Sequence, residues 1–301
     1  MDFWIKALEQ GLIYGILVMG IYITYTILDF PDLSVDGTFP LGGAVAAVCI
    51  VGGMNPHLAL VMALIAGLIA GAVTGLLHVK LGITNLLSGI LVMTGLYSVN
   101  LLIMGKPNTP LLSAKTIFPE AGTGSLYGIL LVIFILTVVV KLALDWYLST
   151  KSGYMLKATG DNPQLVTSLG VSIGKVKIIG IMLSNGLVAL SGGVMAQYNR
   201  FADAQMGVGT IVIGLASIII GLSLFSRIRV MKPTTAVILG AIIYRVAIGI
   251  ALKFNMPSEN LKLVTSLVVI VFLAINNKGT AFKGFFKKSG IKKSAPKKEA
   301  A

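Results

Sequence analysis

The sequence is poor in the residues that build metal sites, disulfide frameworks and soluble surfaces. Of 301 residues, one is Cys, two are His, two are Trp, and only 12% are charged. A single Cys49 cannot form a disulfide framework. Neither His57 nor His78 has a second His, Cys or acid at the spacing of metal ligands, so we expect no metal site. So little charge excludes an ordinary soluble domain.

The sequence also lacks the motifs of hydrolysis and nucleotide binding. Residues 170–176 resemble a phosphate loop, but the spacing is one residue short and Val176 stands where Ser or Thr is required. No Gly-x-Ser-x-Gly elbow stands in a suitable context, and His-Glu-x-x-His is absent. We therefore expect no catalytic residue and no bound cofactor on this chain. A pump built from it would need ATP and magnesium on a partner subunit.

Apolar residues dominate instead. They make up 56% of the chain, and the mean hydropathy is +0.92. About 20 apolar residues span a bilayer as a helix, and the chain offers about nine such runs. Long continuous runs favour helices over the alternating strands of a membrane barrel. The sequence therefore predicts an all-α polytopic membrane bundle of about eight to ten spans. The runs lie near 10–28, 38–54, 57–78, 84–104, 125–147, 177–198, 206–225, 233–252 and 261–276. The first has no small-residue cleavage site, so we expect it to stay on the protein.

Positive charge is unevenly placed. The net charge is +13, and eight Lys lie between Lys278 and Lys298. Such a juxtamembrane cluster orients a chain and contacts anionic lipid rather than nucleic acid. We expect a membrane-spanning domain at 1–277 and a basic cytoplasmic tail at 278–301. The basic loops 148–176 and 226–232 then share the cytoplasmic side. The orientation of the N-terminus stays open.

A polar break interrupts the first two apolar runs, near residues 29–40. It holds Asp29, Asp32 and Asp36 together with two Pro and a Gly. Non-helical backbone at membrane depth persists only where protein or water satisfies it, and such broken helices often line a translocation path. A plain acidic loop, with Asp36 capping the next helix, fits the composition equally well.

Other polar residues lie inside apolar runs. Arg245 would cost about 2.5–3.5 kcal/mol at the bilayer centre unless it is paired or hydrated. It is either a cavity residue facing a ligand or a structural residue that snorkels or forms an ion pair. Its candidate partners are Asp29, Asp32, Asp36 and Asp203.

Intramembrane amides usually bond across helices, and the chain has Asn85, Asn100, Asn185 and Gln197. Gly67, Gly71 and Gly75 share a helical face, which predicts close helix packing.

The loop at 148–176 has a regular layout. Asp161, Asn162 and Pro163 predict a helix start, with a cap followed by proline in the first turn. Gly153 and Gly160 are predicted to break the chain around a first short helix at 154–159, and a second should follow at 163–169. Two short surface helices of this kind can transmit rigid-body motion between subunits.

At these residues a family resemblance becomes visible. The loop resembles the coupling segment of bacterial ABC-importer permeases of the branched-chain amino acid and ribose class. The matching positions are Gly153, Ala158, Gly160, Asn162, Pro163 and Gly170, while Thr167 departs from the pattern. Residues 32–36 are similar to an Asp-Leu-Ser-Val-Gly segment of the sugar permeases, and residues 41–47, which follow, are also similar to the family. Residues 207–221 and 233–240 are similar to helices of the family's second half. The likeness spans 12–276 and is greatest to the uncharacterised group paired with tryptophan- or tyrosine-type binding proteins.

The resemblance implies a permease subunit of an ATP-binding-cassette importer in the bacterial plasma membrane, with no enzymatic activity of its own. It implies ABC ATPase subunits, an extracytoplasmic solute-binding protein, a permease homodimer or pair, and alternating access that carries a small solute, expected to be an amino acid. The ATPase-coupling residues would be Gly153, Ala158, Gly160, Asp161, Asn162, Pro163 and Gly170. The translocation path would include Asp32, Ser34, Asp36, Asn85 and Arg245.

One alternative from another class stays open. An ion-coupled secondary transporter could use Asp29, Asp32 or Asp36 together with Arg245. Dependence of uptake on a partner ATPase separates the two hypotheses. An intramembrane enzyme lacks a catalytic constellation, and a mere scaffold would not need a polar break inside the bundle.

Overall fold

The computed structural model describes residues 2–112, 114–119, 126–225 and 231–253, and beyond them residues 266, 267 and 270. The basic tail at 278–301 and nearly all of the expected last span at 261–276 lie outside the described residues. The elements are α1 (Asp2–Ile21), the π-helix η1 (Tyr22–Ile27), α2 (Val35–Val51), α3 (Pro56–Leu81), α4 (Asn85–Met104), β1 (Asn108–Pro110), α5 (Leu126–Leu148), α6 (Lys151–Asp161), α7 (Pro163–Ser168), α8 (Ile173–Asn199), β2 (Phe201–Asp203), α9 (Thr210–Phe225) and α10 (Pro233–Lys253).

The predicted all-α membrane bundle is confirmed. In the described part of the chain, six helices are long and apolar enough to cross a membrane: α1 with η1, α3, α4, α5, α8 and α10. Two further apolar helices, α2 and α9, are shorter than a span. Each of them begins after a non-helical interruption of the chain, and these interruptions take part in the candidate site described below.

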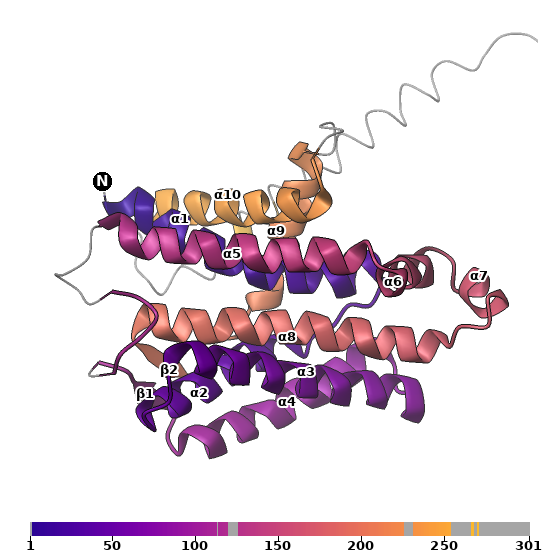
Figure 1. Ribbon diagram of the computed structural model, residues 1–301, viewed down its shortest axis with the longest axis horizontal. Coiled ribbons are helices and arrows are strands. Elements are labelled where there is room, and N and C mark those ends of the chain that lie inside the picture. Colours follow the sequence, from indigo (N-terminus) through magenta and orange to yellow (C-terminus); the bar gives the residue numbers. More distant parts are fainter. Residues whose placement is uncertain are drawn as a thin grey trace, which may run out of the picture.

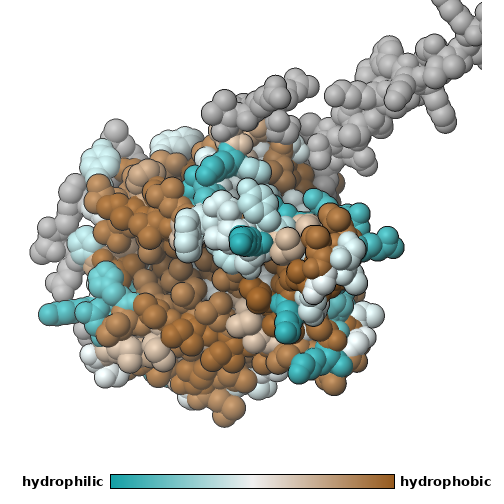
Figure 2. Space-filling view, turned by 45° about the vertical axis from the view of Figure 1, so that its right-hand side comes forward, coloured by the Kyte–Doolittle hydropathy of each residue, from teal (hydrophilic) through white to brown (hydrophobic). Residues whose placement is uncertain are grey.

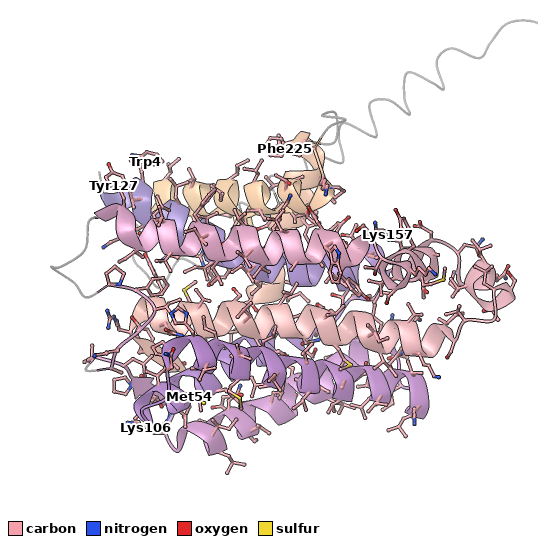
Figure 3. The ribbon with its side chains drawn as sticks, in the orientation of Figure 1. Trp4, Met54, Lys106, Tyr127, Lys157 and Phe225 are labelled. Atoms are coloured by element: carbon pink, nitrogen blue, oxygen red, sulfur yellow. The ribbon has the colours of Figure 1, made fainter. Side chains whose placement is uncertain are left out.

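The bundle has two distinct ends (Figure 1). At one, here called the strand end, β1 pairs antiparallel with β2, and Thr109 lies opposite Ala202. At the other, the loop end, lie α6 and α7. Met54 and Lys106 mark the strand end and Lys157 the loop end (Figure 3). Because α8 leads directly into β2, and η1 ends against α6, helices α1 and α8 run in opposite directions.

The two halves of the chain repeat one pattern with opposite polarity. Helix α1 with η1 is followed by the interruption 28–34, then α2 and α3; helix α8 is followed by 200–209, then α9 and α10. Helix α10 lies antiparallel along α1, as α3 does along α8. Inverted repeats with broken helices are typical of transporters, whose binding sites lie where the repeats meet.

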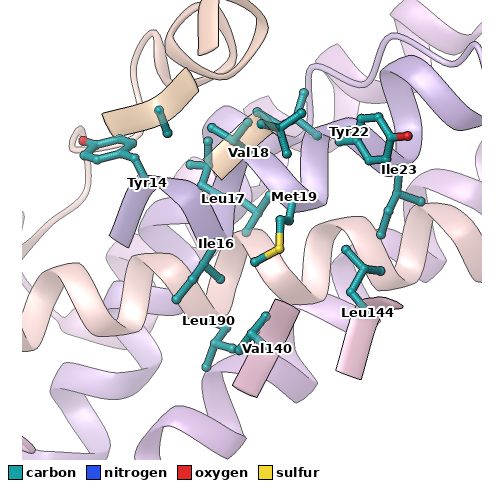
Figure 4. Packing of buried hydrophobic residues seen from close by; sticks show 14 of the residues in the cluster. Tyr14, Ile16, Leu17, Val18, Met19, Tyr22, Ile23, Val140, Leu144 and Leu190 are labelled. Atoms are coloured by element: carbon teal, nitrogen blue, oxygen red, sulfur yellow. The ribbon is translucent and has the colours of Figure 1, made fainter. Parts of the chain in front are cut away.

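Helix α1 forms the centre of the apolar core (Figure 4). Ile16 and Met19 of α1 are buried beside Val140 of α5 and Leu190 of α8, while Leu17 lies against Gly214 of α9. The outer faces of α4 and α5 are apolar and exposed, and brown hydrophobic surface covers much of the face shown in Figure 2. An apolar exterior around a packed interior is expected of a protein whose solvent is lipid.

The predicted glycine face on the third run is confirmed. Gly67, Gly71 and Gly75 of α3 all lie against α8, and a side chain at Gly71 would meet the carbonyl oxygen of Ile181. Small residues at such a spacing let two backbones approach closely, which is the main source of helix association in a bilayer.

Candidate functional site

Asp32 lies at the centre of a buried polar cluster that ties the first interruption to α8. Its Oδ1 accepts a hydrogen bond from the backbone N–H of Ser34 at 2.9 Å, and its Oδ2 accepts one from Asn185 Nδ2 at 2.8 Å. Asn185 Oδ1 in turn accepts from the hydroxyls of Ser34 at 3.1 Å and Thr38 at 2.7 Å. All four side chains are buried. Since the carboxylate also lies at the N-terminus of α2, the helix dipole stabilises its negative charge.

Asp36 joins the two halves of the chain. It lies in the first turn of α2, yet its carboxylate accepts hydrogen bonds from the backbone N–H of Gly209 at 2.9 Å and of Ile211 at 2.8 Å, and from the Thr210 hydroxyl at 2.9 Å. These groups form the N-terminus of α9. The alternative in which Asp36 caps the helix that follows it is therefore wrong, because Asp36 lies inside the first turn of α2 and caps α9 of the other half.

The junction of Asp36 with α9 lies inside the bundle, between its two ends. From there α2 runs to the strand end, where Ile50 and Val51 lie beside Pro110 of β1, while α9 runs toward the loop end. Two short helices thus begin at one buried place and diverge. Asp36 accepts N–H groups at the start of α9, and Asp32 accepts the N–H of Ser34, the residue before α2. Such satisfaction by protein groups is the condition for irregular backbone at membrane depth.

Arg245 is not part of this junction. Its guanidinium lies over the Tyr14 ring, 3.7 Å from the centroid, and its Nη1 donates to Gln10 Oε1 at 3.4 Å. The ion-pair alternative for Arg245 is not supported in the described part of the chain, where its partners are the aromatic face of Tyr14 and the amide of Gln10. Asp32 and Asp36 are already satisfied by N–H and hydroxyl donors. The ring of Tyr14 stabilises the cation instead.

The remaining path residues lie in different surroundings. Ser34 belongs to the Asp32 cluster. Asn85 is the first residue of α4, at the loop end, one helical turn before Gly89, whose Cα lies against the backbone of Leu33. Asp29 is exposed and adopts a left-handed backbone with φ of 50°. The structure therefore brings Asp32 and Ser34 together, places Asp36 next to them in sequence but in a separate network, and leaves Asn85 and Arg245 apart.

Sequence reasoning missed several partners in these networks. Thr38, Gly209 and Thr210 were not singled out, and their hydrogen bonds follow from tertiary contacts across more than a hundred residues. The pair of Glu9 and Tyr198 was also missed; the Tyr198 hydroxyl donates to Glu9 Oε2 at 2.9 Å, and Glu9 is buried. A carboxylate placed just before a long apolar run was the available signal for Glu9.

The loop at 148–176 forms helices α6 and α7. Asn162 caps α7, because its Oδ1 accepts the backbone N–H of Leu165 at 3.2 Å, and Pro163 takes the first helical position. The predicted helix start at Asp161–Pro163 is therefore confirmed. The predicted breaks at Gly153 and Gly160 are wrong, since α6 runs without interruption from Lys151 to Asp161.

The two glycines of α6 serve close packing. Gly160 lies directly against the carbonyl of Ile27, the last residue of η1, and Gly153 lies against the backbone of Tyr147 and Leu148. A side chain at either place would collide with backbone. Leu156 of α6 is fully buried beside them. Helix α6 is thus fitted to the residue that immediately precedes the polar break.

The other predicted coupling residues lie on the outer side of this loop. Ala158 is half-buried, while Asp161 and Gly170 are exposed. Gly170 follows α7 with φ of 73°, the left-handed conformation that commonly ends a helix. Leu165 and Leu169 leave apolar side chains exposed on α7 and the turn after it, and α7 stands away from the bundle (Figure 1). Helices α6 and α7, here called the α6–α7 handle, therefore protrude from the bundle, and α6 connects them to the polar break.

Known proteins are similar to this sequence over nearly its whole length. Residues 4–274 match the family described as "Branched-chain amino acid transport system / permease component". The chain is 48% identical over 279 residues to the tyrosine transport system permease protein of Clostridioides difficile (strain R20291), covering 93% of both chains. It is 37% identical over 278 residues to an uncharacterised protein of Rickettsia prowazekii (strain Madrid E), covering 91% of this chain and 98% of the other.

More distant likeness reaches the sugar permeases. The ribose import permease protein RbsC of Haemophilus influenzae (strain ATCC 51907 / DSM 11121 / KW20 / Rd) is 26% identical over 221 residues, which cover 72% of this chain and 68% of the relative. No solved structure matches the chain at a significant level. The extent and identity of these matches agree with the interrupted helices and the α6–α7 loop. The chain belongs to the family of branched-chain amino acid transport permeases and is a membrane-spanning permease subunit of an ABC importer.

Proposed function

We propose that this permease carries an amino acid with an aromatic side chain into the cell, driven by ATP hydrolysis on partner ATPase subunits that grip α6 and α7. ATP and magnesium would bind those partners and not this chain. An extracytoplasmic solute-binding protein would deliver the solute at the strand end. The preference for an aromatic amino acid rests on the tyrosine permease, which is 48% identical.

The contact of Gly160 with Ile27 carries the mechanism. Because Gly160 lies against the carbonyl of Ile27, a displacement of α6 is passed directly to the residue before the polar break. That break holds Asp32 and Asp36, which fix the N-termini of α2 and α9. Movement of the α6–α7 handle would therefore shift the place where the two halves meet. Alternating access follows if this junction opens toward one side at a time.

Charge supports a cytoplasmic loop end. Lys80, Lys151 and Lys157 lie there, in or beside the turns that join the helices. Lys175 and Lys177 lie there as well, with Asp161 as the one acidic residue of loop 148–176, whereas the strand end has Lys106, Lys115 and Arg200 together with Asp203. Basic residues accumulate in cytoplasmic loops, so α6, α7 and the Lys-rich C-terminal tail would lie inside the cell, in the bacterial plasma membrane. The N-terminus, at the strand end, would lie outside.

Oligomeric state belongs to the same proposal. Helix α4 exposes Leu87, Leu91 and Leu102, and Gly95 on the same helix meets no neighbouring atom. A second permease copy covering this side would enclose a path between two α4 helices. Annular and anionic lipid would cover the remaining apolar exterior.

The test is reconstitution of the purified chain into proteoliposomes with its ATPase and binding protein. We expect accumulation of tyrosine, phenylalanine or tryptophan that requires ATP. Gly160→Ala should retain ATP hydrolysis but lower uptake at least tenfold, because its methyl group would collide with the Ile27 carbonyl. Gly128→Ala in α5 is the matched control, since a methyl group there would make only an ordinary contact with Pro119. Accumulation driven by an ion gradient without the ATPase would overturn the proposal.

The ion-coupled alternative gains no support from the site. It needs an aspartate of the break beside Arg245, whereas Asp36 contacts α9 and Arg245 contacts Tyr14.

A further inference from the structure

A pocket opens beside Asp36, between α2, α4 and the segment 204–208 that leads into α9. Its volume is about 410 Å³, within the range of small-molecule sites. The walls that matter for binding are Met93, Tyr97, Asn100, Gln205 and Val208. The pocket therefore lies next to the junction of the two halves. The side chains that form the hydrogen bonds of the junction leave it open.

Asn100 gives the pocket an unused acceptor. Its side chain is fully buried, and its Nδ2 donates to the carbonyl of Gly37 at 3.2 Å. Its Oδ1 has no hydrogen-bond partner among the described residues. A buried carbonyl oxygen without a partner loses on the order of 1–3 kcal/mol relative to a satisfied one. A ligand that brings an N–H donor to this oxygen would recover that interaction.

The charges around the pocket favour a ligand whose N–H donor is positively charged. Asp36 is the one charged residue among the lining residues described, and it is an anion. Its carboxylate is engaged by the N-terminus of α9, but the net field at the wall still favours a cation over an anion. No Lys or Arg side chain lines the described pocket to hold a carboxylate or a phosphate.

The rest of the wall fits an apolar body. Met93, Val208 and the ring of Tyr97 line it, and Tyr97 is partly exposed. Thioether and aromatic groups make favourable contacts with a planar or branched side chain. The pocket thus combines one acceptor, one nearby anion and apolar walls.

We propose that this pocket receives the transported solute during its passage, with the ammonium group of the solute bound at Asn100 Oδ1 beside Asp36 and its apolar side chain against Tyr97 and Met93. The solute class is a primary amine that bears an apolar or aromatic side chain. This inference rests on the proposed amino-acid transport and specifies where that solute binds.

The first experiment reads the pocket without the other subunits. Because Cys49 is the chain's one cysteine, Cys49→Ala gives a background for Thr94→Cys, which places a thiol in the pocket wall, and for Lys106→Cys at the strand end. The purified variants, in nanodiscs, are labelled with a neutral water-soluble maleimide. We expect both to react, and tyramine to slow labelling at position 94 at least threefold while 4-hydroxyphenylpropionate, which lacks the amine, does not.

Three results would overturn the assignment. No reaction at position 94 would show that lipid or a second copy fills the pocket. Equal protection by both compounds would remove the role of the amine. Protection at position 106 as well would show a global effect rather than binding in the pocket.

The second experiment uses the assembled importer. Asn100→Leu and Tyr97→Ala should each lower kcat/KM for uptake about tenfold, while Leu131→Ala, on the exposed outer face of α5, should leave it unchanged. Tyr97 is partly exposed, so its variant reports on the pocket even if Asn100→Leu folds poorly. Normal uptake by both variants would refute binding of the solute in this pocket. Absence of ATP-driven uptake by the wild-type importer would instead refute the proposed function, and the labelling experiment would still test binding in the pocket.

Discussion

Asp36 Oδ1 accepts a hydrogen bond from the Thr210 hydroxyl at 2.9 Å, although 174 positions separate the two residues in the chain. The bond joins the first turn of α2 to the first turn of α9. Each of these helices starts a new segment after an interruption, and each belongs to a different half of the bundle. The Asp36 carboxylate therefore joins the two halves at the place where a path between them would open.

Asp36→Asn should weaken this junction. The amide keeps one acceptor oxygen but presents N–H donors toward the N–H groups of Gly209 or Ile211. Loss of a charged cap costs about 0.5–2 kcal/mol, so we expect a lower melting temperature and uptake reduced several-fold. The measurements are thermal unfolding in detergent and uptake in proteoliposomes.

Asp29→Asn is the matched control for the lost charge. Asp29 lies in the same break but is exposed, and asparagine accepts its left-handed backbone. This variant should retain both stability and uptake. If the two substitutions had equal effects, the charge of the break and not the cap on α9 would be the relevant property.

Asn185→Leu should disrupt the buried cluster around Asp32. Asn185 both donates to the Asp32 carboxylate and accepts from Ser34 and Thr38. Removing it leaves a buried carboxylate short of a donor, which costs on the order of 1–3 kcal/mol. We expect loss of folded protein at growth temperature, measured by fluorescence-detection size exclusion. The double variant Asp32→Asn with Asn185→Leu should recover part of the yield, since the charge is then absent; no recovery would argue against this account.

The apolar periodicity of the sequence was enough to predict the helices but not their meeting places. Eight of the nine expected runs coincide with described helices, because long apolar segments have few alternatives in a bilayer. The helix start at Asn162 and the glycine face of α3 were also predictable from local rules. The predicted role of Gly160 as a helix breaker was wrong, because its closest neighbour is Ile27, far away in the sequence.

The candidate site was predicted only as a segment. The density of aspartate and proline marked residues 29–40, yet nothing local indicated that Asp32 would bond to α8 and Asp36 to α9. Those partners depend on how the halves pack. The same limit explains Arg245, whose aromatic partner Tyr14 belongs to a different helix and carries no charge that a search for ion pairs would detect.

Asn162→Ala should affect coupling more than folding. Asn162 caps α7 through Leu165, and α7 lies outside the packed bundle. Loss of such a cap costs roughly 1 kcal/mol, enough to fray a helix of six residues but not to unfold the permease. We expect an unchanged melting temperature and ATP-driven uptake reduced about threefold or more. Asn162→Asp, which keeps a capping oxygen, should retain uptake, and equal loss in both would assign the effect to a direct contact of the amide.

Arg245→Met tests whether the partly buried guanidinium is structural. The side chain lies flat on the Tyr14 ring, and Tyr14 in turn stacks on Phe39 of α2, with ring centroids 5.9 Å apart. Methionine keeps an unbranched apolar chain over the ring and removes a charge whose Nε has no partner among the described residues. Replacing a buried charge by a well-packed apolar residue is often neutral or stabilising, so we expect the melting temperature to stay the same or rise and uptake to remain within about twofold.

Arg245→Ala, which also removes the packing over Tyr14, should lower the melting temperature. Loss of uptake in the stable Met variant would instead make Arg245 a functional residue of the path.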